Sequence, residues 1–325
     1  MDISRRDFFG AAGMAAAGAA AVAAGGCAVP AVSKPCPNGA SSFAYGPKGR
    51  LRITVPGLSQ DVRVFVIGDT HFGLHDARDD AYAGNYARMA RGPNPTKAFA
   101  DTLAKAKNEK PDILLLVGDI ISFPTLANVE HVKRELDACG IDWYYVAGNH
   151  DWHFEGVPGS DEAQRAEWAP KRLAPLYRGL DPFMSSRLVK GIRFVAIDDS
   201  IYHISEKQLE FWKAEAAKGD PMVLFMHVPL WLDGWGRASL FTCGNPDWGA
   251  ATDPYWEIER REKWAEKQSP ASFAFRDAVL STPNLAAVMT GHIHTLLTGC
   301  ERGKYMFTTP SNRTGEFLDV RFTAK

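Results

Sequence analysis

The chain has 325 residues, of which 46% are hydrophobic and 23% are charged. These fractions exclude an intrinsically disordered chain, because disorder requires low hydrophobicity combined with a high net charge. The net charge of -1, from 37 basic and 38 acidic residues, argues against long nucleic acid or an anionic membrane as the main partner, since both favour a basic excess.

The first 27 residues are typical of an export signal. Arg5 and Arg6 precede an uncharged stretch, Phe8–Gly26, that consists largely of Ala and Gly. The paired arginines followed by Phe8 and Phe9 resemble the twin-arginine (Tat) signal, whose pathway carries folded proteins. We therefore expect the Tat export machinery as a partner and a periplasmic or other extracytoplasmic location. An Ala-rich membrane anchor is the alternative, because the uncharged stretch is long enough to cross a bilayer.

Two features follow the signal. Cys27 comes after Ala24-Gly25-Gly26, which is similar to the cleavage site of bacterial lipoproteins without its usual Leu. A lipid anchor on Cys27 would be the only membrane contact that we expect of the mature chain. Residues 28–50 are rich in Pro, Gly and Ser and show no apolar period, so they predict a tether.

Residues 51–325 alternate short apolar runs with helical patterns, which predicts an α/β domain. The predicted strands are Leu51–Val55, Val62–Ile67, Ile113–Val117, Trp143–Val146, Ile192–Ile197, Met222–Met226, Leu285–Met289, Lys304–Phe307 and Phe317–Phe322. The predicted helices are Thr96–Asn108, Asn128–Ala138, Ser205–Lys218 and Ser272–Leu280. Residues 230–268 form an aromatic-rich insert with five tryptophans, which we expect either to overhang a site or to pack on the sheet.

Five of the predicted strands end in side chains that bind metals or transfer protons. These side chains are Asp69, His71, Asp119, Asn149, His150, Asp151, His227, His292 and His294. The carboxyl ends of strands form the edge where α/β sheets bind ligands. Asp69 and His71, like His292 and His294, are two residues apart, a spacing that can point both side chains the same way.

The types of side chain at these strand ends indicate a metal site. Carboxylate oxygen and imidazole nitrogen suit Mn, Fe, Zn, Ni or Co, and the lack of thiolates excludes a purely structural zinc site. These side chains outnumber the ligands that one ion needs, which predicts two ions sharing a bridging carboxylate. Such pairs bind phosphoryl oxygen and generate a hydroxide nucleophile.

The same residues form five sequence blocks that match, in order, the signature blocks of the calcineurin-like metallophosphoesterases. The blocks are Asp69-x-His71, Gly118-Asp119, Gly148-Asn149-His150-Asp151, His227 and Gly291-His292-x-His294. This resemblance covers about residues 60–300 and implies a four-layer α/β/β/α sandwich around a dinuclear metal centre.

The resemblance also implies a role for each residue. Asp119 would bridge two divalent or trivalent ions. The other ligands would be Asp69, His71 and His294 on the first ion and Asn149, His227 and His292 on the second. His150 would protonate the leaving oxygen, with Asp151 as its orienting partner, because an imidazole of pKa about 6.5 exchanges protons near neutrality. A metal-activated hydroxide would be the nucleophile.

The implied activity is the hydrolysis of a small phosphate ester, with a phosphomonoester as the expected substrate. One alternative is a phosphodiesterase that acts on a cyclic nucleotide or a phospholipid head group. Another is a non-catalytic, metal-binding or scaffold member of the fold. Asp198 and Asp199 also follow an apolar strand but match none of the five blocks, so we interpret them as structural residues.

Overall fold

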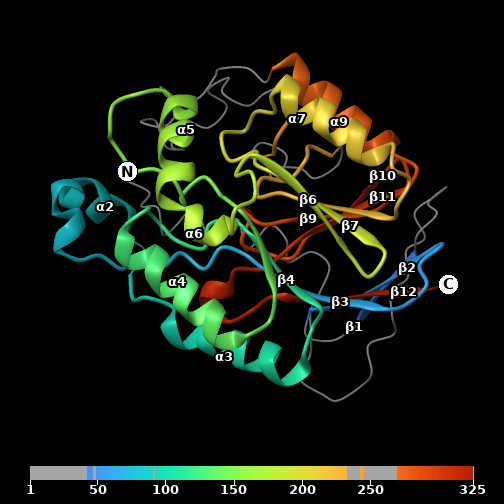
Figure 1. The fold of residues 1–325 in the computed structure, drawn as a ribbon, viewed down its shortest axis with the longest axis horizontal. Helices are drawn as coiled ribbons and strands as arrows, with labels where there is room; N and C mark the ends of the chain where they lie inside the picture. Colours follow the sequence, from blue (N-terminus) through green and yellow to red (C-terminus); the bar gives the residue numbers. More distant parts are fainter. Residues whose placement is uncertain (1–41, 47–48, 91, 233–241, 245–268, 325) are drawn as a thin grey trace, which may run out of the picture. The chain divides into compact units, whose positions relative to one another are not determined.

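The apolar runs of the sequence form two six-stranded sheets in a computed structural model of the chain (Figure 1). The structure describes residues 42–46, 49–90, 92–232, 242–244 and 269–324. In the first sheet the strand order is β1-β2-β12-β3-β4-β5, and in the second it is β10-β11-β9-β8-β7-β6. Buried side chains fill the space between the sheets and the space between each sheet and its helices.

The first sheet is built around parallel strands that are buried on both faces. Its members are β1 (Ser42–Gly46), β2 (Arg50–Val55), β12 (Leu318–Ala324), β3 (Val62–Ile67), β4 (Ile113–Val117) and β5 (Trp143–Val146). β3, β4 and β5 run parallel, whereas β12 is antiparallel to β3 and parallel to β2. In β4, Leu114 and Leu116 face the helices while Leu115 and Val117 face the second sheet, as expected for a strand covered on both sides.

The second sheet is also mainly parallel. Its members are β10 (Thr298–Glu301), β11 (Lys304–Thr308), β9 (Leu285–Thr290), β8 (Met222–Phe225), β7 (Ile192–Ile197) and β6 (Met184–Val189). The four central strands run parallel, and the two edge strands, β6 and β10, are antiparallel to their neighbours.

Helices cover the outer face of each sheet and complete a four-layer α/β/β/α sandwich (Figure 1). On the first sheet lie α3 (Thr96–Glu109) and α4 (Leu126–Cys139), and on the second lie α7 (Glu206–Ala216) and α9 (Pro270–Ser281). The remaining elements are η1 (Ala77–Tyr82), α2 (Ala83–Met89), α5 (Asp161–Arg172), α6 (Ala174–Tyr177) and η3 (Asn312–Thr314). The predicted fold class is thus confirmed.

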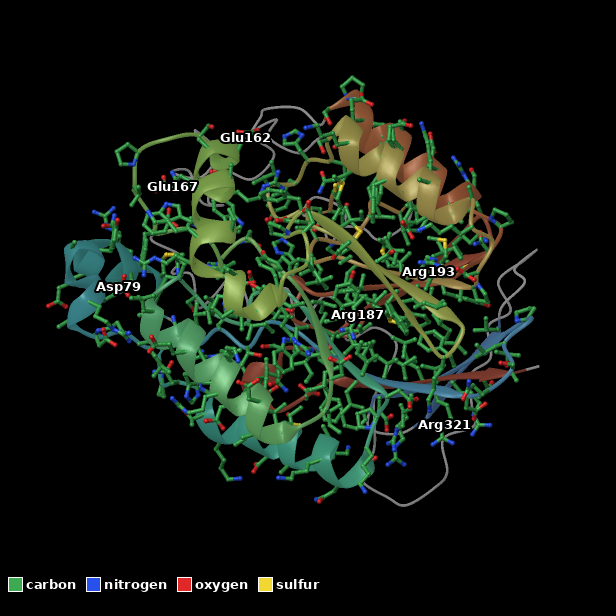
Figure 2. The ribbon with its side chains drawn as sticks, viewed as in Figure 1. Asp79, Glu162, Glu167, Arg187, Arg193 and Arg321 are labelled. Carbon is green, nitrogen blue, oxygen red and sulfur yellow. The ribbon has the colours of Figure 1, made fainter. Side chains whose placement is uncertain are left out.

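The two sheets are also joined by polar contacts at one margin of the sandwich. Arg187 of β6, which is labelled in Figure 2, donates a hydrogen bond to the carbonyl of Trp143 in β5 (3.0 Å) and forms an ion pair with Asp142. Arg193 of β7 pairs with Asp220 (2.5 Å), at the start of the next strand. The contacts of Arg187 hold the hairpin β6–β7 against β5, whereas the pair of Arg193 and Asp220 lies within the second sheet.

The predicted tether is wrong over part of its length. Residues 42–46, which fall within the segment 28–50, form strand β1 and pair with β2 in an antiparallel register. The domain therefore begins before residue 51. The sequence conceals this strand because Gly and Pro residues surround it, and these residue types are common in flexible tethers as well as next to strands.

Three further predictions lie outside the residues that the structure describes. They are the export signal, the anchor at Cys27 and most of the insert 230–268. From the insert, Trp231 is described, and its ring packs against the guanidinium of Arg276 in α9 (4.8 Å). Across the described ranges, no helix has both the length and the apolar character that are needed to span a bilayer.

The cysteines of the described part differ in state. Cys139 and Cys243 are buried free thiols. Cys300, in the edge strand β10, is disulfide-bonded.

Candidate metal centre

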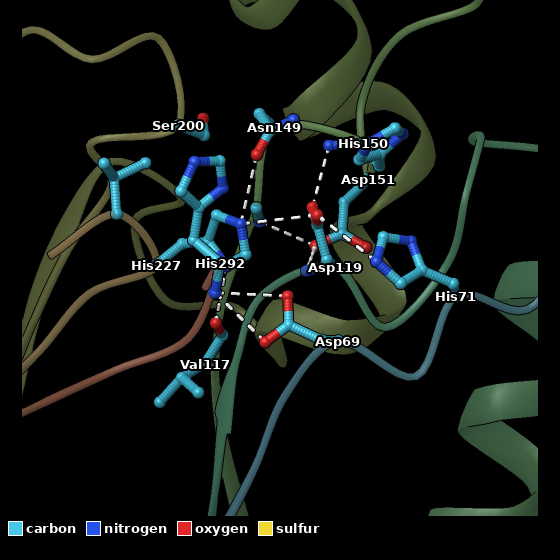
Figure 3. Close-up of polar contacts among 12 residues, drawn as sticks. Asp69, His71, Val117, Asp119, Asn149, His150, Asp151, Ser200, His227 and His292 are labelled. Atoms are coloured by element: carbon cyan, nitrogen blue, oxygen red, sulfur yellow. Dashed lines mark hydrogen bonds and ion pairs between the residues drawn. The ribbon is translucent and has the colours of Figure 1, made fainter. Parts of the chain in front are cut away.

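The loops that follow the parallel strands bring the predicted ligands together at one edge of both sheets (Figure 3). Two groups of metal-binding side chains form there, and in each group the ligand atoms lie within 4.8 Å of one another. Asp119 belongs to both groups. The first group is Asp69, His71, Asp119 and His294, and the second is Asp119, His227 and His292.

In the first group, two imidazoles and two carboxylates converge. The Nε2 atoms of His71 and His294 are 3.1 Å apart. Asp69 Oδ1 lies 3.3 Å from Nε2 of His294, and Asp119 Oδ2 lies 3.7 Å from Nε2 of His71. Asp69 also accepts the backbone N–H of His292 with both of its carboxylate oxygens, at 3.1 and 3.0 Å. The bonds from His292 therefore fix the orientation of the Asp69 carboxylate.

In the second group, His227 is the central side chain. Its Nε2 atom lies 3.3 Å from Asp119 Oδ2 and 3.1 Å from Oδ1 of Asn149, which places the predicted amide ligand beside this group. Its Nδ1 atom lies 2.8 Å from the carbonyl oxygen of Val117. A carbonyl can only accept a hydrogen bond, so Nδ1 carries the proton and Nε2 faces the two oxygens.

This set of atoms fits bound cations. With its proton on Nδ1, a neutral His227 directs a lone pair towards the oxygens of Asp119 and Asn149, which also carry only lone pairs. Such an arrangement requires a positive charge, from either a second proton or a metal ion. Without a metal, burial would lower the pKa of His227, but the Asp119 carboxylate beside it raises that pKa to about 10. The Nε2 atoms of His71 and His294 can likewise share at most one proton.

The electrostatics of Asp119 agree with a bridging position. Asp119 is almost fully buried, and burial alone would raise its pKa. The neighbouring imidazoles of His227, His150 and His71 instead hold the pKa of Asp119 well below its usual value. Asp119 is therefore ionised at neutral pH and can offer both oxygens to cations.

Several ligand residues adopt a backbone conformation that is rare for side chains with a Cβ atom. Ten non-glycine residues in the described ranges have a positive φ, and six of them lie at this site. The six are Asp69, His71, Asp119, Tyr202, His292 and His294, with φ between 51° and 69°. The left-handed conformation costs roughly 1–2 kcal/mol per residue, and such strain gathers at functional sites.

The left-handed conformation explains why two ligands that are two residues apart reach the same group of ligand atoms. Asp69 and His71 lie beyond the end of β3 and not in an extended strand. Both side chains reach the first group because each residue is left-handed, and not because a strand alternates its faces. The spacing therefore predicted correctly that Asp69 and His71 lie together, although it assumed an extended strand and the observed backbone is left-handed.

Glycines next to the ligands allow the loops to approach closely. A Cβ atom at Gly118 would lie 2.6 Å from both the nitrogen of Gly148 and Nδ1 of His227. A Cβ atom at Gly148 would overlap the carboxylate of Asp119. At these two positions any side chain would push apart loops that carry ligands.

His150 lies beside the first group. Its backbone N–H donates to Oδ1 of Asp119 (2.8 Å), and its ring packs edge-on against His71 with a centroid distance of 5.0 Å. The residue is buried. This position is consistent with a proton donor next to two metal ions, and the role itself stays a prediction.

The carboxylate of Asp151 contacts backbone groups and not the ring that the family resemblance implied. Its carboxylate accepts the backbone N–H groups of Gly148 (2.6 Å), Asp119 (2.8 Å) and Ile121 (2.9 Å). These bonds tie together the loops after β4 and β5, so we interpret Asp151 as a residue that positions the backbone of Asp119 and not as the partner of the His150 ring. Burial, together with the charge of Asp119, raises the pKa of Asp151 to about 7.

Two residues that are not among the predicted ligands contact the second group. Asp199 Oδ1 accepts the backbone N–H of His227 and of Val228, both at 3.1 Å. The hydroxyl of Tyr202 lies 2.7 Å from Nε2 of His292. The contacts of Asp199 agree with a structural role, because its Oδ1 atom binds two backbone N–H groups. Burial raises the pKa of this carboxyl to about 8. Tyr202 belongs to none of the five sequence blocks.

The chain is similar to a known family of proteins. A family model described as calcineurin-like phosphoesterase matches residues 62–296, from the first residue of β3 to just beyond His294. No curated protein sequence gives a significant match.

The chain is also similar to solved structures that share little of its sequence. A dimetal phosphatase from Danio rerio is 15% identical with a TM-score of 0.48, over 78% of this chain and 88% of that one. A purple acid phosphatase from yellow lupin (Lupinus luteus) is 14% identical with a TM-score of 0.47, over 86% of this chain and half of the lupin chain. Phosphopantetheinyl hydrolase from Mycobacterium tuberculosis is 11% identical with a TM-score of 0.41, over 80% of this chain and 96% of that one.

Proposed function

The chain belongs to the calcineurin-like phosphoesterase family, and from this premise we propose that it is a metal-dependent phosphomonoesterase with a dinuclear centre. The observation that carries the proposal is the convergence of two groups of ligand atoms on the shared carboxylate of Asp119. One ion would be held by Asp69, His71, Asp119 and His294, and the other by Asp119, Asn149, His227 and His292. When bound, the ions would neutralise the charge of a phosphate group and lower the pKa of the attacking water.

The protein groups would have distinct tasks in this reaction. The Asp119 carboxylate would hold both ions at a fixed separation, because Asp151 and the loop glycines fix its backbone. His150 would carry a proton on its ring and transfer it to the leaving oxygen of the ester. The bond from its backbone N–H to Asp119 holds the main chain of His150 beside the ligands of both ions, which would position the proton donor near the substrate.

The charge of the chain favours a small phosphate ester over a long nucleic acid. With a net charge of -1, the protein lacks the basic excess that binding of a long polyanion requires. A small ester would instead be held through its phosphate by the two cations. A phosphodiesterase that acts on a cyclic nucleotide or a phospholipid head group uses the same kind of metal pair and is the alternative that the experiment must separate.

The test uses the purified chain, stripped of metal with a chelator and reloaded singly with Mn, Fe, Zn, Ni or Co. We expect at least one metal to restore hydrolysis of p-nitrophenyl phosphate, with kcat/KM roughly tenfold or more above that for bis-p-nitrophenyl phosphate. An Asp119→Asn variant, prepared in parallel, excludes a contaminating phosphatase. Faster hydrolysis of the diester would favour the phosphodiesterase, and two bound ions with no hydrolysis of either ester would contradict an enzyme.

A further inference from the structure

Two loops that carry none of the predicted ligands lie against the candidate centre. The first, residues 198–202, follows β7, and the second, residues 309–313, follows β11. The second loop lies beyond residues 62–296, the part of the chain that matches the family model. Each of these loops contacts the ligands of one group.

The loop 198–202 contacts the second group. Asp199 holds the backbone of His227, since its Oδ1 atom accepts the N–H groups of His227 and Val228. Tyr202 contacts the ring of His292 through its hydroxyl (2.7 Å). Tyr202 is itself fixed, because it is fully buried and its N–H donates to the carbonyl of Asp199 (2.7 Å). One loop therefore contacts both histidines of the second group.

The contact from Tyr202 bears directly on how His292 can bind an ion. With Nε2 facing the hydroxyl, the ring offers its other nitrogen, Nδ1, to a metal. Metal binding at Nδ1 requires the ring proton on Nε2, and Tyr202 Oη is placed to accept it. Such an outer partner fixes both the tautomer and the orientation of a metal-binding imidazole.

The loop 309–313 contacts the first group through backbone carbonyls. Ser311 Oγ donates to the carbonyl of Asp69 (2.6 Å), and the N–H of Ser311 donates to the carbonyl of His294 (3.3 Å). Arg313 Nη1 donates to the carbonyl of His71 (3.3 Å). All three ligands that are unique to the first group are thus held by residues 311 and 313.

From these contacts we propose that the two metal sites are positioned separately. Residues 311–313 hold the ligands of the first ion, and residues 199–202 hold those of the second. Tyr202 and Ser311 are the positioning residues chosen for the test, because each contacts a ligand of its site through a single hydroxyl. The inference rests on the metal centre of the proposed function, and it adds that one site can be weakened while the other keeps its affinity.

The test measures metal binding in two proteins that each retain one site. His294→Ala removes a ligand of the first ion only, and His227→Ala removes a ligand of the second ion only. Tyr202→Phe and Ser311→Ala are introduced into each, and the Kd for Mn²⁺ is measured from the electron paramagnetic resonance of free Mn²⁺ and by calorimetry. Tyr177→Phe is the control, since Tyr177 is also buried but lies in α6.

We expect a crossed pattern. Tyr202→Phe should weaken Mn²⁺ binding about 10- to 100-fold in the His294→Ala protein, the usual effect of losing an outer partner, and leave it within twofold in the His227→Ala protein. Ser311→Ala should do the reverse, by about tenfold, and Tyr177→Phe should change neither. Equal weakening in both proteins, or no weakening in either, would overturn the inference.

A second measurement applies if the single-site proteins do not fold or do not bind Mn²⁺. In the otherwise unchanged chain, Mn²⁺ is titrated and its two binding steps are resolved. Tyr202→Phe and Ser311→Ala should each weaken a different step, and the double variant should weaken both, whereas weakening of the same step would contradict separate positioning. A chain that binds two ions and hydrolyses no ester would overturn the proposed function alone, and a chain that binds fewer than two would overturn both.

Discussion

At the scale of single residues, the centre combines ordinary ligand types with unusual backbone geometry. Asp, His and Asn at strand ends were recognisable from the sequence because they occur together at five strand ends and their oxygen and nitrogen atoms suit metals. The left-handed conformations of Asp69, His71 and Asp119 were not, since each depends on contacts with loops that are distant in the sequence. The N–H groups of Asp69 and His71, for example, bind the carbonyls of Gly118 and Asp119.

Contacts between loops that are distant in the sequence also determine the role of Asp151 and the place of Tyr202 at the site. The family resemblance implied that Asp151 orients the ring of His150, whereas the fold turns its carboxylate towards three backbone N–H groups. Tyr202 approaches His292 across 90 positions of sequence. A contact of this kind becomes visible only when the sheet order is known.

His150 allows a prediction that separates proton transfer from metal binding. In a His150→Ala variant, kcat for an alkyl phosphate should fall about 10²- to 10³-fold, because the leaving alkoxide needs a proton. For p-nitrophenyl phosphate the fall should be much smaller, since p-nitrophenolate leaves without one. The measurement is steady-state kinetics on both esters, with metal content determined for each sample.

The control for this variant is His131→Gln, which changes a histidine of α4 whose ring packs on Phe72. It should leave the ratio of the two rates unchanged. A His150→Ala protein that binds two ions and loses equal activity on both esters would contradict the role of general acid.

At the scale of elements, the sequence was informative about the centres of the sheets and less so about their margins. β3, β4, β5 and β7 were predicted with their observed bounds, because each is a largely apolar run that is buried on both faces over most of its length. The edge strand β6 escaped prediction since most of its side chains are only half-buried. An edge strand needs an apolar pattern on one face at most, and over four to six residues this pattern is weak.

α5 was missed for a related reason. Its sequence is strongly charged and contains Pro170, so apolar spacing did not reveal it. Its start depends on Ser160, whose hydroxyl accepts the N–H of Ala163 (3.3 Å), with acidic residues in the first turn and basic residues in the last. Caps and end charges of this kind complement the helix dipole.

The cap of α5 therefore predicts a stability change without a functional one. Ser160→Ala should lower the free energy of unfolding by about 1 kcal/mol, because one N–H of the first turn loses its acceptor. Urea denaturation followed by circular dichroism measures this change. Ser160→Thr keeps the acceptor and should stay within a few tenths of a kcal/mol of the unchanged chain. If both variants were equally stable, the cap would contribute nothing measurable, and altered ester hydrolysis in Ser160→Ala would show that α5 influences the site.

At the scale of the whole molecule, the centre joins the two sheets. Asp69, Asp119 and Asn149 follow strands of the first sheet, while His227 and His292 follow strands of the second. The apolar runs alone predicted that these strand ends share one edge, and the family resemblance implied that two sheets packed face to face form it. Any ion bound by both sets of ligands is therefore a link across the interior of the sandwich.

This link predicts that metal ions stabilise the protein as a whole. Ions that bind only the folded chain add stability in proportion to the logarithm of their free concentration, by about 2.7 kcal/mol per tenfold rise for two sites well above their Kd. The unfolding temperature should accordingly fall on chelation and rise with added Mn²⁺, measured by calorimetry at a series of free Mn²⁺ concentrations. His227→Ala, which removes a ligand supplied by the second sheet, should reduce the slope to about half, whereas His131→Gln should preserve it. A slope that is the same in the His227→Ala protein would mean that the stabilising ions bind elsewhere, because His227 contacts both Asp119 and Asn149 across the two sheets.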